Sequence, residues 1–210
     1  MTRKKQKIIL PRWNKNLINS GLYKQLEFIK EIDKLKSIFR KTRILDNSRH
    51  ENDAEHSYHL AMMAVILSGY SNTKIDVNKV IKMVLVHDLP EIYSGDIMVY
   101  NKKQGEISKE DNEAADKIFG MVPAPMGDEL KALWREFEEK KTPEAKFAAA
   151  IDRLEPIMQN HAHNGGAWVE HKISKERVVE VNSHIGNGSA ELWEYARNLI
   201  EECADKGFIK

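Results

Sequence analysis

Cysteine is nearly absent from this 210-residue chain, and neither sign of charge is in excess. The single cysteine, Cys203, excludes an intramolecular disulfide and is typical of a protein in the reducing cytoplasm, where we expect this one to act. Lysine and arginine number 33 against 32 aspartate and glutamate residues, which gives a formal net charge of +1. Domains that bind nucleic acid polymers are usually strongly basic, so this balance argues against such a partner.

Long apolar runs are also missing, and no stretch approaches the roughly 18 residues of a membrane span. The chain begins MTRKKQKIILPRW, which is basic and then briefly apolar. The apolar part, IILP, is too short for the hydrophobic region of a signal peptide. We therefore expect no membrane association and interpret residues 1–18 as a flexible basic segment.

The motifs of several enzyme classes are missing too. There is no P-loop, no glycine-rich dinucleotide motif and no nucleophile elbow. No long stretch alternates apolar and polar residues as half-buried strands do, whereas apolar residues recur at helical spacing. Hydrophobic residues make up 41% of the chain, enough for an ordinary core. The sequence thus predicts an all-α fold with one domain over residues 19–210.

Helix signals divide this domain. Capping residues indicate three helix starts, namely Asp53, Asp76 and Thr142, the last followed by a proline at the first helical position. The segment HNGGAWVEHK is expected to be a loop. The expected helices, with approximate bounds, are residues 22–39, 54–70, 77–89, 108–122, 128–140, 142–162 and 189–203.

Histidine and aspartate stand side by side where the third of these helices meets a loop. The pair His87-Asp88 follows the apolar run KVIKMVLV and precedes LPEIYSGD. A neutral imidazole and a carboxylate in this position are typical metal ligands. In the alternative, His87 favours the dipole of a helix C-terminus and Asp88 makes a local hydrogen bond. An aspartate on an apolar helix face needs a cation or several donors, which favours a site.

Partners for this pair lie on either side. His56 falls in the first turn of its helix, which suits a neutral imidazole better than a charged one, although it could be a core histidine. Asp152 lies in KFAAAIDRLEP, where alanines allow close approach, although it could pair with a neighbouring Arg or Lys. Two histidines and two aspartates would make a compact site for one divalent cation: Mn²⁺, Co²⁺, Fe²⁺, Ni²⁺, Zn²⁺ or Mg²⁺.

Two further acidic residues follow the pair. Glu91 comes one turn after His87 and shares its face if the helix continues past Pro90, and Asp96 follows a Ser-Gly. Four titratable groups within ten residues, directly after a core helix, favour a site over a solvated surface.

Together these residues resemble the HD-domain superfamily of metal-dependent phosphohydrolases. The phrases AEHSYHLA, VLVHDLPEIYSGD and AKFAAAIDRLEP are similar to its YfbR-like 5′-deoxynucleotidase branch. The resemblance implies a homodimer of compact HD-domain helical bundles, each with a core of about residues 35–160 and C-terminal helices packed on it. It also implies roles for six residues: His56, His87, Asp88 and Asp152 bind the metal, and Glu91 and Asp96 position water and transfer protons.

The resemblance has one clear departure. The deoxynucleotidase branch carries an Arg-Trp pair shortly before the first ligand histidine, where it contacts phosphate and sugar. Here the stretch is FRKTRIL, with Lys41-Thr42 in place of that pair and Arg40 and Arg43 on either side. Guanidinium matches phosphate geometry, so we expect Arg40 or Arg43 to bind the phosphate. The missing aromatic side chain predicts a weaker preference for deoxyribose.

Histidines elsewhere bear on the number of metals. None lies between Asp88 and Asp152, where HD-fold enzymes with two or three metals need extra ligands, so a mononuclear site is favoured. His161 and His163 come later and are interpreted as surface residues. Trp168 either covers a base or fills an edge of the core.

We therefore expect a phosphohydrolase that removes phosphate from a small phosphorylated metabolite, with nucleoside 5′-monophosphates as the leading class. The cation would lower the pKa of a bound water toward ~7, Glu91 would orient or deprotonate that water, and Asp96 would protonate the leaving alkoxide. The alternatives are a phosphodiesterase or a nucleoside triphosphate hydrolase on the same site, and a binding module without turnover. Both acidic residues argue against the last alternative, because binding alone has no need of them.

Overall fold

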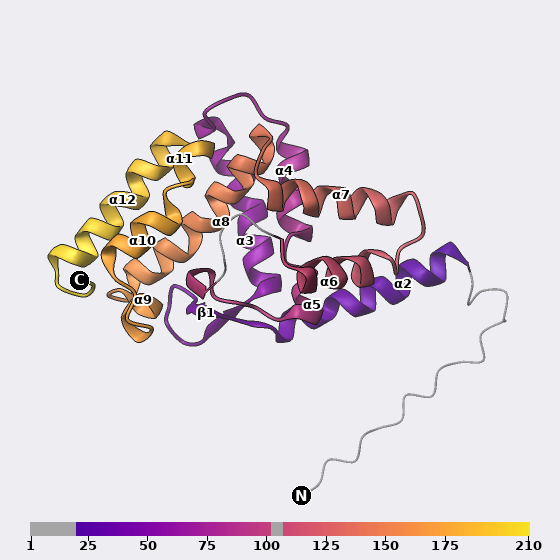
Figure 1. Cartoon of the computed structure of the whole chain (residues 1–210), viewed down its shortest axis with the longest axis horizontal. Coiled ribbons are helices and arrows are strands. Elements are labelled where there is room, and N and C mark those ends of the chain that lie inside the picture. The colour runs from indigo at the N-terminus through magenta and orange to yellow at the C-terminus, as the bar shows by residue number, and fades with distance from the viewer. Residues whose placement is uncertain (1–19, 102–106) are drawn as a thin grey trace, which may run out of the picture.

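The computed structural model describes residues 20–101 and 107–210, and in them the expected all-α fold is confirmed (Figure 1). The segment 1–18, expected to be flexible, lies outside the described residues. The α-helices are α2 (Gly21–Ile32), α3 (Asp53–Leu67), α4 (Val77–Val86), α5 (Glu91–Ser94), α6 (Lys109–Phe119), α7 (Met126–Glu139), α8 (Pro143–Ala162), α9 (Gly166–Glu170), α10 (Lys175–Asn182), α11 (Ile185–Gly188) and α12 (Ala190–Asp205). Short 3-10 helices are η1 (Asp33–Ser37), η2 (Ser68–Tyr70) and η3 (Val99–Asn101). No described helix has the length and apolarity needed to cross a membrane.

The long helix α8 lies at the centre of the larger of two apolar cores. It packs against α3, α4, α7, α11 and α12. Its alanines leave room for close neighbours, and a Cβ on Gly188 of α11 would collide with the carbonyl of Lys146. Leu60, Val84 and Ile151 are fully buried there. Burial of each such side chain contributes about 1.5–3 kcal/mol, so α3, α4 and α8 are held together firmly.

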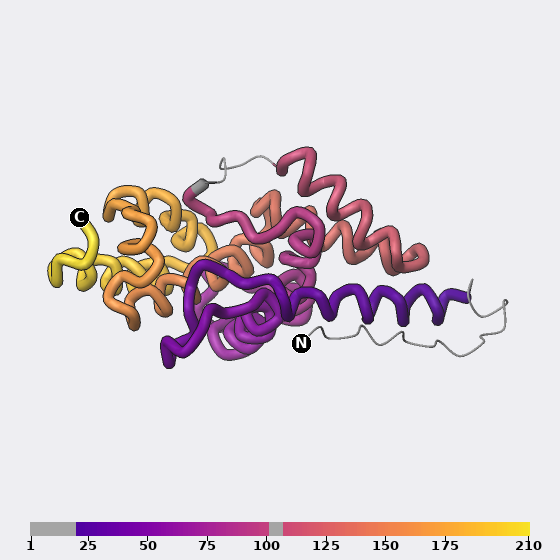
Figure 2. The backbone as a smooth tube through the Cα atoms, turned by 90° about the horizontal axis from the view of Figure 1, so that it is seen from below, coloured from indigo at the N-terminus to yellow at the C-terminus, as the bar shows by residue number. Residues whose placement is uncertain are grey.

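A smaller core joins α2, η1, α6 and α7, and includes Phe28, Leu35 and Trp134. Figure 2 shows α2 extending beyond the central helices on the same side of the molecule as α6 and α7. Because so much of α2 projects, Leu26 and Ile29 of its expected apolar stripe are 48% and 58% exposed.

The helix predicted for residues 22–39 is shorter in the structure than predicted. The α-helix stops at Ile32, η1 follows, and residues 39–43 form a strand instead. This strand, β1 (Phe39–Arg43), pairs antiparallel with β2 (His50–Asn52), in a segment expected to be a loop. The hairpin satisfies the backbone groups that a longer helix would have satisfied, and it turns residues 40 and 42 inward while 39, 41 and 43 are exposed.

Helix caps were predicted with mixed success. Asp76 and Thr142 cap α4 and α8 as expected. The N-cap of α3 is Asn52, not Asp53: its side chain accepts from the amide of Glu55, and the Glu55 side chain reaches back to the Asn52 amide. This frees Asp53 to point inward, where it is fully buried. The loop expected at residues 163–172 contains the short helix α9.

Candidate metal centre

Four predicted ligands converge where α3, α4 and α8 pack together. His56 lies in the first turn of α3, His87 is the C-cap of α4 with Asp88 next to it, and Asp152 lies midway along α8. Their exposed fractions are 0%, 5%, 7% and 4% in that order, so all four are inside the protein. The structure thus brings together residues up to 96 positions apart in the chain.

The polar atoms of these side chains face one another. Nε2 of His56 lies 3.0 Å from Oδ1 of Asp152. Nε2 of His87 lies 3.1 Å from Oδ1 of Asp88 and 3.6 Å from Oδ1 of Asp152. Two ring nitrogens and two carboxylates therefore surround one small volume.

The hydrogen bonds of His87 test whether this set fits a cation. Its Nδ1–H donates to the carbonyl of Val84 at 2.8 Å. Nε2 consequently carries the lone pair in the neutral ring, and within the described residues it has no hydrogen-bond partner. A buried lone pair aimed at two carboxylates requires a positive charge between them. The donor set, two imidazoles and two carboxylates, suits a first-row divalent cation.

The charge states agree with this fit. Burial alone would raise the pKa of Asp88, but His87 and Arg40 outweigh it and lower that pKa well below its usual range. Burial likewise opposes ionisation of Asp152, whose pKa is nevertheless lowered, chiefly by Arg153 and His56. Both carboxylates are ionised at neutral pH, as metal ligands must be.

For the imidazole of His87 the balance has the opposite sign. Burial lowers its pKa, yet the charges of Asp88 and Asp152 raise it well above the usual value. The surroundings therefore stabilise a positive charge at Nε2 of His87, and either a proton or a metal ion supplies that charge.

A carboxylate behind His56 orients its ring. Nδ1 of His56 lies 3.3 Å from Oε2 of Glu155 and 3.6 Å from Oε2 of Glu51. Such a carboxylate–histidine pair holds a ligand nitrogen toward its metal and raises its basicity. The sequence reasoning missed Glu155, although its position one turn after Asp152 on the same helix places both on one face.

The two candidate arginines have different surroundings. Arg40 turns inward from β1 with its side chain 13% exposed, and its Nη1 lies 3.1 Å from Asp88 Oδ2 and 3.6 Å from Asp53 Oδ1. Arg43 is exposed and donates to the carbonyl of Asn47. Only Arg40 of the two lines the large cavity described next.

A cavity of about 950 Å³ opens from the metal centre, and Glu91 and Asp96 lie in its wall. The helix does not continue past Pro90: α4 ends before His87, and α5 begins anew at Glu91. Gly95, with φ of 78°, then turns the chain, and its amide donates to the carbonyl of Glu91 at 2.8 Å. The positive φ favours glycine, and the turn leads to Asp96, which lines the same cavity as Glu91.

The remainder of the cavity wall combines basic and aromatic side chains. Trp168 is 1% exposed and packs in the larger core, and its Nε1–H donates to the hydroxyl of Tyr100 at 2.8 Å. Trp168 therefore fills an edge of the core, and this edge lines the cavity. Basic side chains on the wall besides Arg40 are Lys41, Lys109, Lys140, Lys141 and Arg153. The same wall carries seven acidic side chains against these six basic ones, so the cationic groups that could meet an anionic ligand alternate with carboxylates.

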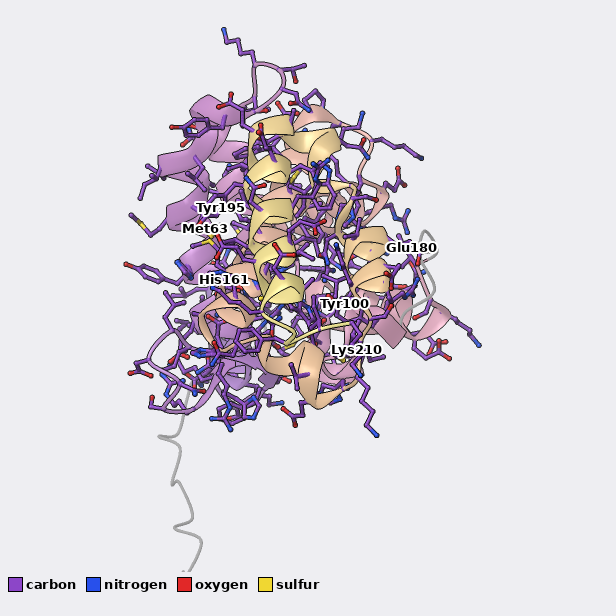
Figure 3. All side chains as sticks on the ribbon, turned by 90° about the vertical axis from the view of Figure 1, so that its left-hand side faces the viewer. Met63, Tyr100, His161, Glu180, Tyr195 and Lys210 are labelled. Atoms are coloured by element: carbon purple, nitrogen blue, oxygen red, sulfur yellow. The ribbon has the colours of Figure 1, made fainter. Side chains whose placement is uncertain are left out.

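The two later histidines lie elsewhere. His161 is beside α12, with its Nε2 3.0 Å from Oε2 of Glu202 (Figure 3). His163 donates to the carbonyl of Ile44. Neither lines the large cavity, as expected for residues outside the metal centre.

Comparisons with known proteins agree with one another. A family model described as HD domain matches residues 32–193, a segment that contains all four predicted ligands. The chain is 32% identical over 140 residues to the 5′-deoxynucleotidase HDDC2 of Danio rerio, a match that covers 66% of this chain and 68% of that protein. It is 31% identical over 168 residues to the 5′-deoxynucleotidase YfbR of Escherichia coli, covering 75% and 84%. The crystal structure of a predicted metal-dependent phosphohydrolase from Magnetospirillum magnetotacticum MS-1 is 39% identical, with coverage of 90% and 96% and a TM-score of 0.85.

Proposed function

This chain belongs to the HD domain family, and on that premise we propose that it is a metal-dependent phosphohydrolase that acts on nucleoside 5′-monophosphates. The observation that carries the proposal is the convergence of two histidines and two aspartates at one end of a cavity of about 950 Å³. Arg40, Glu91 and Asp96 line the same cavity. Binding alone would need no acidic residues beyond the ligands, so hydrolysis is favoured over a binding module.

The cation would be held by His56, His87, Asp88 and Asp152. When bound, it supplies a Lewis acid for the phosphate and lowers the pKa of water. Glu91 accepts the proton of the attacking water, and Asp96 donates a proton to the leaving sugar oxygen, so that phosphate and a nucleoside result. Arg40 orients the phosphate and neutralises part of its charge.

This chain differs from the 5′-deoxynucleotidase branch that it resembles in the residues expected to contact the sugar of the substrate. Thr42 lines the cavity but is too small to stack on a sugar ring. Trp168 is fixed by its bond to Tyr100 and by the core around it, so it does not replace the missing aromatic side chain. We therefore expect both ribonucleotides and deoxyribonucleotides to be hydrolysed. Strict rejection of ribonucleotides would contradict this assignment.

A substrate screen tests the function. Metal-free protein supplied with Mn²⁺ or Co²⁺ should release phosphate from nucleoside monophosphates, and the Asp88→Ala variant should not. Cyclic nucleotides and nucleoside triphosphates, assayed beside them, represent the phosphodiesterase and triphosphatase alternatives. Turnover of either class at a higher kcat/KM than every monophosphate would overturn the proposal.

We further propose a homodimer that forms through α3. The outer face of this helix exposes Tyr58, Met62, Val65 and Ile66 by 68%, 42%, 51% and 67%. No charged residue follows His59 in α3, so the face is apolar and uncharged, as in surfaces that associate. Ile66→Glu should convert a dimer to a monomer in light scattering. A monomeric wild-type protein would refute this assembly.

A further inference from the structure

A second group of potential ligands lies behind His56, on the side away from Asp88 and Asp152. It contains Glu51 of β2, His59 of α3 and Glu155 of α8. One ligand atom from each lies within 4.8 Å of the others, and Nδ1 of His59 is 3.2 Å from Oε1 of Glu155. Three elements from distant parts of the chain therefore meet with two carboxylates and one imidazole.

Acceptor atoms outnumber donors in this group. Glu51 and Glu155 are 3% and 1% exposed; Oε2 of Glu51 has no hydrogen-bond partner among the described residues, and Oε2 of Glu155 faces Nδ1 of His56 at 3.3 Å. Gln159, 3% exposed, donates its amide Nε2 to Oε1 of Glu155, which leaves its own Oε1 buried without a donor. Buried acceptors without donors are costly, and two of them, on Glu51 and Gln159, beside the buried carboxylate of Glu155 indicate a missing positive group.

The positive side chains nearby do not supply the missing positive charge beside Glu51 and Glu155. Nε of Arg40 lies 3.9 Å from Oε2 of Glu51, but its guanidinium also serves Asp53 and Asp88. His56 contacts Glu51 and Glu155 only through Nδ1, while its Nε2 faces the metal centre.

We propose that Glu51, His59 and Glu155 bind a second divalent cation, with the amide oxygen of Gln159 as a further ligand. Nitrogen and oxygen donors of this kind suit Mn²⁺, Co²⁺ or Zn²⁺. In the single chain the side chain of His59 is 43% exposed, so this ligand of the group reaches the protein surface. Because the ring of His56 stands between the two sites, this is not a catalytic metal pair of the kind that shares one substrate at roughly 3.5–4 Å. The ion would instead fix Glu155, and with it the orientation of His56.

Metal stoichiometry tests the proposal without any activity assay. Metal-free full-length protein is equilibrated with Co²⁺, and bound ions are counted by elemental analysis after dialysis, with visible absorption recorded alongside. Wild type should bind two ions per chain, and His59→Ala should bind one, with the second Kd raised more than about 100-fold, because loss of even an outer partner costs 10–100-fold. His59 is partly exposed, so this variant should fold, and an unchanged far-UV circular dichroism spectrum checks it.

Three further variants separate the sites. Glu51→Gln should also bind one ion, whereas His161→Ala, a matched loss of a partly exposed histidine, should still bind two. Asp88→Ala should lose the ion of the proposed phosphohydrolase centre and keep the second, so failure of one proposal is distinguishable from failure of the other. One ion in the wild type that Asp88→Ala loses would overturn the second site, as would two ions in both His59→Ala and Glu51→Gln.

Discussion

Two arginines of one strand provide a matched test of phosphate binding. Arg40 and Arg43 both belong to β1, but only Arg40 lines the cavity and contacts Asp88. We predict that Arg40→Gln lowers kcat/KM for a nucleoside 5′-monophosphate while Arg43→Gln leaves it unchanged. Glutamine keeps much of the side-chain volume and removes the charge, so the comparison isolates the guanidinium.

The size of the effect follows from the bond that is lost. A hydrogen bond to a charged group contributes about 1.5–3 kcal/mol, which corresponds to a loss of roughly 10- to 150-fold in kcat/KM. Stability should fall as well, because Arg40 also neutralises Asp53 and Glu51. Removing one partner of a buried ion pair costs on the order of 3–5 kcal/mol, whereas an exposed change such as Arg43→Gln stays within about 0.5 kcal/mol.

The assay measures phosphate release at saturating Mn²⁺, at a temperature where urea unfolding shows both variants to be folded. The fall in kcat/KM must appear in the folded Arg40→Gln protein with its metal content unchanged. Equal losses in the two variants, or a loss in Arg43→Gln alone, would refute the assignment of Arg40 to the phosphate. Lost metal in Arg40→Gln would mean that the arginine supports Asp88 and not the substrate.

Three other changes have defined outcomes. Asp88→Ala should bind no ion at the first centre and show no turnover, since a charged ligand is lost; activity at low metal concentration would contradict the site. Glu91→Gln should keep its metal but lose turnover by roughly 10²–10⁴-fold, as for a general base; a metal-free variant would make Glu91 a ligand. Burial, then the charges of Arg153 and Lys140, lower the pKa of His184 from 6.5 to about 4. Between these two pH values the unfolded chain binds a proton at this histidine and the folded chain does not. The free energy of unfolding should therefore fall more between about pH 7 and pH 5 in wild type than in His184→Gln, and equal falls in denaturant titrations would refute this.

The convergence of the metal ligands could be anticipated because each ligand sits within strong local patterns. His56 and His87 lie on helices whose apolar faces are readable at a spacing of three and four residues. Caps such as Asp76 and Thr142 fix where two of the three helices begin, and hence which face each ligand occupies. Local patterns of this kind are set by neighbouring residues, so one sequence reveals them.

The hairpin and the carboxylates behind the ligands depend on distant partners instead. The strand β1 has five residues and β2 three, too few for alternation to stand out, and the partner of Arg40, Asp88, lies 48 positions away in the chain. Asp53 has the sequence signature of a helix cap, yet Asn52 takes that role. Glu155 has the sequence signature of an exposed helix position. Its role as the carboxylate partner of His56 depends on a contact with a residue distant in the chain.

Charge explains why these features occur together. The buried acidic side chains of the described chain all surround the metal centre, and they are Glu51, Asp53, Asp88, Asp152 and Glu155. No lysine or arginine in the described residues is buried to the same degree, although Arg40 contacts Glu51, Asp53 and Asp88 and Arg153 contacts Asp152. Since an unpaired buried carboxylate is costly, further positive charge stabilises the fold around the cavity. A cation that binds the native state and not the unfolded chain would supply it, so the residues proposed to bind the metal would also tie the stability of the core to its presence.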